Sequence, residues 1–458
     1  IHIFIPFRPL RLQILILDKF NRGRPSPAKP PVPGAQTPQK PLLADLGLTP
    51  FFDKENFLGN RYDSAEVQGL LADERIETDE TARVALLEQI QGVLAEDLST
   101  LPLLQGSQIA VTGTDIEGVE KTIDGSFQFR FATFVKGGDN SAKVTVGTTD
   151  VVAYLDPAFT YDNGSYVVQA NVFPMVMAFQ QGNPAPQPSL AESCEFTAEG
   201  YEYTCKIRSG LKWANGHTLD ANDIKFTYDR QQAIAHPNGP SSLLANLVST
   251  EVADPLTVVF KLAGPFDVTF PQVLASPVGP VVDDEVFNPT DITPPEEILA
   301  ANAFAGAYTI TTFTAGELIE FAPNPGYDGI QGQVQNGGVV TRYYKEGNNM
   351  RLDIESGEID VVWRSLTATD YAQLETSDKV KVLHGPGGEI RYIVFNLETM
   401  PGDTPEQRLA VRQAVALSID RPALAEQVYQ GSYTPLCSYV PDGLPGATQS
   451  VCDLYGGE

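Results

Sequence analysis

Histidine and long apolar runs are rare or absent in this sequence. Four histidines occur in 458 residues, and they stand singly at positions 2, 217, 236 and 384. Isolated histidines do not supply the clustered ligands of a zinc site. No run of about 18 apolar residues occurs, so no membrane-spanning helix is predicted. The opening 20 residues are interrupted by Pro and Arg, and the chain is expected to lack its export signal.

Glycine-rich stretches do not supply a catalytic or phosphate-binding motif either. The cluster Gly385-Pro386-Gly387-Gly388 has no Lys-Ser/Thr after it, so it is interpreted as a turn. Asp162-Asn163-Gly164 lacks the further acids of a calcium loop and is also interpreted as a tight turn. No nucleophile elbow is found. The sequence therefore predicts no catalytic residue, no metal and no cofactor, and it does not indicate an enzyme.

Positively charged residues are few. The chain carries 31 Lys and Arg against 58 Asp and Glu, which gives a net charge of -27. A chain this acidic is repelled by nucleic-acid phosphates and by anionic lipid, so neither is expected as a partner. The charge also favours solubility.

The four cysteines fall into two local pairs, Cys194 with Cys205 and Cys437 with Cys452. Neither pair has the Cys-x-x-Cys spacing of zinc and redox sites. A hairpin through Glu199-Gly200 could bring Cys194 within bridging distance of Cys205. Two disulfides are therefore predicted, and they indicate an oxidising, extracytoplasmic location. The alternative is four buried free thiols in a cytosolic protein.

Composition separates the beginning of the chain from the rest. Residues 1–43 are rich in Arg, Lys and Pro, with Asp18 as the only acid, and are interpreted as a foreign or disordered segment. A chain of 458 residues exceeds one compact core, so two or three domains are expected.

Helix and strand patterns are mixed along the remainder. An amphipathic helix is predicted from Asp79 to near Pro102, with Thr78 as its cap. A second helix is predicted to begin at Pro405, after a capping box opened by Thr404, and Asp420-Arg421-Pro422 should end it and start another. Strand patterns occupy 143–146, 201–207, 258–262 and 308–313. The mixture predicts an α/β or α+β fold.

The most specific pattern lies between Ala191 and Arg230. A strand is followed by the basic Gly turn Leu211-Lys212, an aromatic, Asn215-Gly216 and a helix that Thr218 or Asp220 can cap. This pattern resembles the signature of family 5 of the solute-binding proteins of ABC importers. Residues 144–157 resemble the mature start of that family. Further family motifs follow in the expected order at Gly306-Ala307-Tyr308, Asn324-Pro325-Gly326-Tyr327, Gly357-Glu358-Ile359-Asp360-Val361, Arg391-Tyr392-Ile393-Val394-Phe395-Asn396 and Val411-Arg412-Gln413-Ala414-Val415.

The resemblance implies a periplasmic-binding-protein-like type II clamp, whose two lobes close on a di- or oligopeptide and present it to the permease subunits of an ABC transporter. It implies a monomer, in the periplasm or lipid-anchored at the cell surface. Nickel, haem and oligosaccharide are rival ligands on the same scaffold, and the isolated histidines disfavour metal. Ligand contacts are implied at Pro174, Met175, Pro240, Ser241, Arg364 and Asn396.

The order of the segments departs from the family. Residues 49–137 resemble its carboxyl end. The family's stretch between the equivalents of Gly456 and Phe51 is missing, and that stretch contains an Asp-rich motif whose acid is expected to hold a peptide's amino group. The implied domains are lobe I at 106–395, joined tail to head near 137–143, and an incomplete lobe II made of 49–105 and 396–458. Circular permutation, fusion of neighbouring gene copies and an assembly error would each give this order. A truncated or rearranged non-functional product, or a chaperone or sensor ectodomain, is the alternative function.

Overall fold

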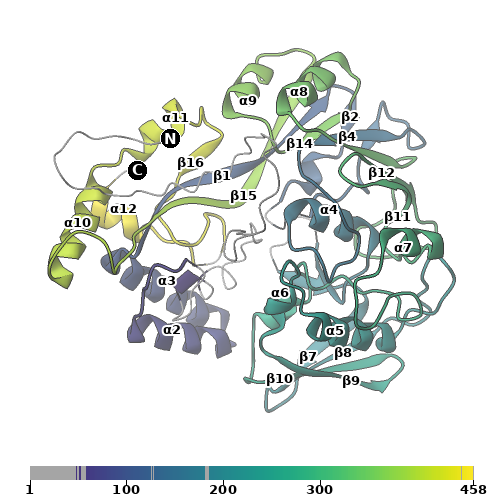
Figure 1. Ribbon diagram of the computed structural model, residues 1–458, viewed down its shortest axis with the longest axis horizontal. Coiled ribbons are helices and arrows are strands. Elements are labelled where there is room, and N and C mark those ends of the chain that lie inside the picture. Colours follow the sequence, from purple (N-terminus) through teal and green to yellow (C-terminus); the bar gives the residue numbers. More distant parts are fainter. Residues whose placement is uncertain are drawn as a thin grey trace. The chain divides into compact units, whose positions relative to one another are not determined.

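The structure, a computed structural model, describes residues 48, 51–52, 58–124, 126, 128–180, 185–444 and 446–456. The interpretation of residues 1–43 lies outside them. The described residues divide into two compact units (Figure 1): unit 1 contains those up to residue 107 and from residue 386 onward, and unit 2 contains residues 108–385. The chain passes from unit 1 to unit 2 within strand β1 (Thr100–Gly113) and returns within strand β15 (Val380–Val394).

Unit 1 is made from two stretches of chain that are distant in sequence and share one hydrophobic core. Leu87, Ile90 and Leu94 of the first stretch are buried in the same cluster as Tyr439 and Val451 of the second. The hydroxyl of Tyr439 donates to the carbonyl oxygen of Leu94 (2.8 Å). Besides parts of β1 and β15, the elements are α2 (Ala65–Ile76), α3 (Glu80–Asp97), α10 (Pro405–Leu417), α11 (Arg421–Gln427), β16 (Tyr433–Pro435) and α12 (Ser450–Tyr455).

Unit 2 contains a mixed sheet whose central strands are parallel. Strand β4 (Val144–Thr148) lies between β13 (Val339–Tyr343) and β14 (Val361–Trp363) and is parallel to both. Antiparallel neighbours extend the sheet, with β12 (Leu318–Pro323) and β11 (Tyr308–Thr314) beyond β13, and β1 beyond β14. This arrangement places the carboxyl ends of the three parallel strands at one edge, where α/β sheets usually bind ligands.

A second, antiparallel sheet of unit 2 has the order β7-β8-β10-β9, with helix α5 (Ala221–Ile234) packed on it (Figure 1). The strands are β7 (Ala191–Phe196), β8 (Glu202–Ile207), β9 (Leu247–Asp254) and β10 (Thr257–Leu262). Asp220 caps α5 and forms a capping box with Asp223. Tyr228 of α5 meets the ring of Phe260 edge-on, with centroids 5.3 Å apart, so the apolar face of the helix covers the sheet.

Short elements complete unit 2. They are β2 (Ile116–Glu117), η1 (Glu120–Thr122), β3 (Val135–Lys136), α4 (Asn163–Val172), β5 (Met177–Phe179), β6 (Pro186–Pro188), η2 (Ser241–Leu244), α6 (Phe270–Val273), α7 (Pro295–Ala301), α8 (Gly347–Ser356) and α9 (Ala368–Leu374). Among the described helices of both units, none has the length and apolar character that crossing a bilayer requires.

Both predicted disulfides are present. Cys194 and Cys205 are directly opposite each other in the antiparallel pair β7–β8 and are bonded. Cys437 and Cys452 are bonded within unit 1 and tie α12 to the segment after β16. Because each bridge closes a short loop, it restrains a local part of the fold.

Most predicted elements are found, and three local interpretations are wrong. Helix α3 is capped by the side chain of Asp79, which accepts from the backbone of Ala82, rather than by Thr78. Helix α4 begins at Asn163 with Asp162 as its cap, so the expected tight turn is a helix start. The glycine cluster at 385–388 lies inside β15 and is a strand, not a turn.

Candidate functional site

Unit 2 contains a cavity of about 210 Å³. Its lining includes Leu190, which directly precedes β7, and Arg208, which directly follows β8. Segments far apart in sequence form its walls: the end of α4, residues 173–179, the basic turn at 208–212, and the loop 326–331 after β12. Each segment contributes a few side chains, so the cavity exists only in the folded unit. Its size suits one ligand group rather than a whole chain, because an apolar cavity of about 150 Å³ already holds a benzene molecule.

One part of the cavity wall is apolar. Phe173, Met175, Phe179, Leu190 and Leu219 line it, and each is buried in the fold. Apolar lining of this kind favours a ligand group that is itself apolar, because burying its surface releases it from water.

The other part of the wall is positively charged. The lining includes three cationic side chains, Arg130, Arg208 and Lys212, against a single carboxylate, Asp328. Arg208 donates through Nη1 to Asp328 (2.9 Å) and through Nε to the carbonyl oxygen of Ser189 (2.9 Å). Because Asp328 is mostly exposed, water screens its half of that pair.

The other two cations are held differently. The guanidinium of Arg130 is buried, pairs with Asp124 and donates to the carbonyl oxygen of Phe179. The ammonium of Lys212 donates to Oγ1 of Thr218 (2.8 Å), and none of the described carboxylates pairs with it. The basic turn therefore carries a charge that the fold itself does not neutralise.

Tyr327 brings a hydroxyl group into this cationic region. Its oxygen accepts from the backbone N–H of Gln331 (3.1 Å). Burial raises the pKa of Tyr327 to about 12, and the charges of Arg208 and Arg130 oppose part of that rise. The hydroxyl is therefore neutral at ordinary pH and lies within electrostatic reach of both guanidinium groups, where it can donate to an anion.

The structure brings only some of the predicted contact residues together. Pro174 and Met175 both line the cavity. Pro240 and Ser241 are at the start of η2, elsewhere in unit 2. Arg364 follows β14 with a left-handed backbone (φ 60°), and its N–H donates to Ile109 (3.2 Å).

Asn396 belongs to unit 1, where its side chain accepts from the backbone of Glu398 and Thr399 (3.1 Å each). That pattern is a local turn, which short Asn side chains commonly stabilise. The ligand-contact role of all six predicted residues stays a prediction.

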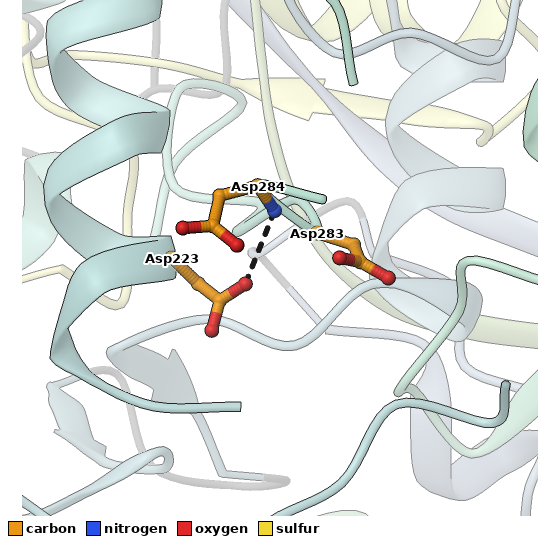
Figure 2. Close-up of side chains that lie close together, drawn as sticks. All are labelled: Asp223, Asp283 and Asp284. Carbon is orange, nitrogen blue, oxygen red and sulfur yellow. Dashed lines mark hydrogen bonds between the residues drawn. The ribbon is translucent and has the colours of Figure 1, made fainter. Parts of the chain in front are cut away.

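A second candidate is a cluster of three carboxylates, Asp223, Asp283 and Asp284, drawn in Figure 2. One oxygen of each lies within 4.8 Å of the others, a spacing that a divalent cation could use. Protein donors already occupy the buried members. Asp223 accepts from the indole N–H of Trp213 (3.1 Å) and from the backbone of Asp284 (3.2 Å; dashed in Figure 2) and Asp220 (2.9 Å).

Asp283 is satisfied in the same way. It accepts from the side-chain amide of Asn215 (2.8 Å) and is hydrogen-bonded to Nδ1 of His217 (2.9 Å). Burial raises the pKa of Asp223 to about 7 and also raises that of Asp284. These bonds join the start of α5 to the segment at 283–284, so the cluster is explained as a structural junction that needs no ion.

Sequence reasoning did not identify Arg130, Arg208, Lys212 or Tyr327 as site residues. Arg208 and Lys212 are the first and last residues of the basic turn at 208–212, which belongs to the most specific sequence pattern. Tyr327 ends the Asn-Pro-Gly-Tyr motif. The sequence contains both motifs, but no short-range sequence pattern indicates that they line one cavity together with Arg130.

Comparison with known proteins places these motifs in context. Residues 185–454 match the profile described as bacterial extracellular solute-binding proteins, family 5 Middle. The chain is 27% identical over 334 residues to a putative ABC transporter peptide-binding protein of Brucella ovis, covering 70% of this chain and 56% of that protein. It is 27% identical over 255 residues to the glutathione-binding protein GsiB of Escherichia coli, covering 56% and 48%. The chain thus spans about half the length of these curated relatives.

Among solved structures, the ABC transporter substrate-binding protein CtaP of Listeria monocytogenes is similar, with a TM-score of 0.54 and 20% identity. The match covers 68% of this chain and 61% of that one. At this level of identity the likeness shows a shared mixed α/β fold.

Proposed function

The chain belongs to family 5 of the bacterial extracellular solute-binding proteins, and on this premise we propose that it binds a peptide or peptide-like solute and delivers it to the permease subunits of an ABC importer. The family binds solutes and is non-enzymatic, which agrees with the prediction that the chain is not an enzyme. The two disulfides are consistent with a location outside the cytoplasm.

The observation that carries the proposal is the match over residues 185–454, because this range contains the basic turn at 208–212 and the loop 326–331 of the cavity wall. Two relatives are named for peptide binding and for binding glutathione, which is itself a tripeptide. Peptide main chains offer both donors and acceptors, and a wall that combines apolar and charged side chains suits such ligands.

We propose that unit 2 corresponds to lobe I and unit 1 to part of lobe II of the family clamp, with segments in permuted order. The shared core of unit 1 supports this, because residues from α3 pack with residues after position 436. Arg412 of α10 also donates to the carbonyl oxygen of Asp97 at the end of α3 (2.7 Å).

A thermal-unfolding scan with a mixed pool of di- to hexapeptides tests the function. A ligand at about 100 times its dissociation constant adds roughly 2.7 kcal/mol to stability, so the Tm should rise by several degrees. A pool of oligosaccharides at the same concentration is the control. A cooperative transition that neither pool shifts would contradict solute binding and favour a product without transport function. A shift with saccharides alone would replace the peptide by that rival ligand.

A further inference from the structure

Unit 2 contains a second, much smaller cavity at the carboxyl ends of its three parallel strands. Its volume is about 20 Å³. The lining includes the last residue of each strand, Thr148 of β4, Tyr343 of β13 and Trp363 of β14. None of the residues that line it also lines the cavity of about 210 Å³. The small cavity is therefore a separate feature of the main sheet.

Three residues of this lining each have a buried polar atom that bonds to no other part of the described chain. The atoms are Oδ2 of Asp150, Oγ1 of Thr341 and Nε1 of Trp363. The side chains of Thr341 and Trp363 are almost completely buried, with 5% and 3% exposed. Buried polar groups are nearly always hydrogen-bonded, either to protein or to ordered water. Three such atoms around one cavity therefore indicate a bound molecule that is shared between them.

Packing holds these side chains in place. The indole ring of Trp363 stacks on the ring of Phe129, with centroids 3.8 Å apart and planes inclined by 13°. The side chain of Asp150 lies against the backbone of Gly164 in α4, where a Cβ would be 2.8 Å from Cβ of Asp150. Close-packed side chains do not move freely to find other partners. A molecule that satisfies the three polar atoms must therefore enter the cavity.

Volume and chemistry determine the occupant. One water molecule needs about 10–15 Å³, so a cavity of about 20 Å³ accepts one water and no larger solute. Water can accept from the indole N–H and donate to the carboxylate and to the hydroxyl, and about three bonds are typical of a buried water. A cation fits poorly, because calcium takes about six to eight oxygen ligands and the indole presents a hydrogen instead of an oxygen.

We propose that this cavity binds one internal water molecule, which accepts from Nε1 of Trp363 and donates to Oδ2 of Asp150 and Oγ1 of Thr341. The water joins β13, β14 and the segment after β4 through bonds that the chain does not make by itself. The inference goes beyond the proposed function and does not depend on it. Its tests use no solute, so their failure leaves solute binding untouched, and a failure of solute binding leaves the water site untouched.

A crystal structure of the full chain that resolves ordered waters tests the site directly. One density peak is expected at about 2.7–3.2 Å from all three polar atoms. The absence of a peak, or side chains that have turned to bond other protein groups, overturns the proposal. Crystals grown with rubidium in place of sodium and potassium separate water from a cation. An anomalous signal at the site would identify a cation and overturn the assignment to water.

The two tryptophans of the chain allow an internal comparison in solution. With 15N-labelled indoles, the N–H of Trp363 should show a nuclear Overhauser effect to bound water. The N–H of Trp213 donates to Asp223 (3.1 Å) and should show none. Thr341→Val removes one partner of the water and should abolish most of the Trp363 signal. Thr312→Val, at an exposed position in β11 of the same sheet, is the matched control and should preserve it.

Three results of the solution experiment would contradict the site. They are a wild-type Trp363 indole without the effect, a signal that Thr341→Val leaves unchanged, and an equal loss in Thr341→Val and Thr312→Val. The wild-type spectrum decides the first of these without any substitution, so the test does not depend on how well a variant folds.

Discussion

Both carboxylate oxygens of Asp156 are bonded by the guanidinium of Arg230, Nη1 to Oδ1 at 2.9 Å and Nη2 to Oδ2 at 2.5 Å, and both side chains are buried. The pair joins the segment after β4 to helix α5. Asp156 also accepts from the backbone N–H of Thr293 (2.7 Å). The carboxylate is therefore a junction between three segments of unit 2.

Replacing Asp156 by Ala should be strongly destabilising, because it leaves the Arg230 charge buried without its partner. Breaking a buried pair costs about 3–5 kcal/mol, which urea unfolding can measure. The matched control is Lys225→Met in the same helix. Lys225 pairs with Asp229 at a half-exposed position, and its loss should change stability by less than about 0.5 kcal/mol. Similar costs for both variants would contradict the role given to burial.

The pH dependence of stability should reflect Asp223. Burial raises the pKa of this carboxyl to about 7, whereas an aspartate in an unfolded chain titrates near about pH 4. Between these values the folded form binds more protons, so this group's contribution to stability is complete below about pH 4 and is lost as the pH rises toward 7. Urea unfolding at a series of pH values measures the slope.

The variant Asp223→Asn should flatten that slope, because the amide does not titrate. Asp229→Asn, near the other end of the same helix and partly exposed, is the control and should retain it. A slope that is identical in the wild type and Asp223→Asn would show that another group is responsible.

Two glycines should respond to alanine in opposite ways. A Cβ on Gly306 would lie 2.5 Å from the carbonyl oxygen of Asn171 and 2.6 Å from the carbonyl carbon of Val172, so backbone must move, at a cost of about 1–3 kcal/mol. Gly92 in helix α3 has open space at the same position, and alanine there should stabilise by about 0.5–1 kcal/mol. Thermal unfolding of both variants checks this, and a neutral Gly306→Ala would refute the close approach.

The bridge between Cys437 and Cys452 should matter to unit 1. It closes a loop of sequence separation 15, for which loop entropy predicts a stabilisation of about 3 kcal/mol. Helix α12 has six residues and is too short to persist by itself. The double variant Cys437→Ser/Cys452→Ser should therefore have a lower Tm than the wild type. Reductant, which breaks both bridges, should lower the wild-type Tm toward that of the variant in which all four cysteines are replaced by Ser. An unchanged Tm in both experiments would contradict this contribution.

Local features of the fold were predictable wherever neighbouring residues decide them. Thr404 caps α10 and Asp420 caps α11, as the sequence indicates. The predicted strand at 201–207 is β8, and Cys205 lies opposite Cys194 as the hairpin suggests. Capping and strand alternation depend on contacts within a few residues, so they can be recognised before the tertiary structure is known.

The wrong local interpretations have identifiable physical causes. Thr78 and Asp79 are both good caps, and the choice between them depends on which side chain reaches the N–H of Ala82. The glycine cluster at 385–388 has turn-forming composition, yet it is extended within β15. Gln105 contributes to that arrangement by donating to the carbonyl oxygen of Gly387 (2.8 Å) from a strand 282 residues away in sequence, so a distant contact overrides the local preference.

The sequence by itself determined the family, the mixed α/β class, the two cysteine pairs and the positions of the main helix starts, because short-range patterns and ordered motifs carry that information. Only the tertiary structure showed that the two flanking segments share one core and that Arg130, the basic turn and Tyr327 line the same cavity as Pro174 and Met175. Those facts depend on long-range packing. The charged side chains that line this cavity, from Arg130 to Asp328, are far apart along the chain, and no local pattern specifies which of them will face each other.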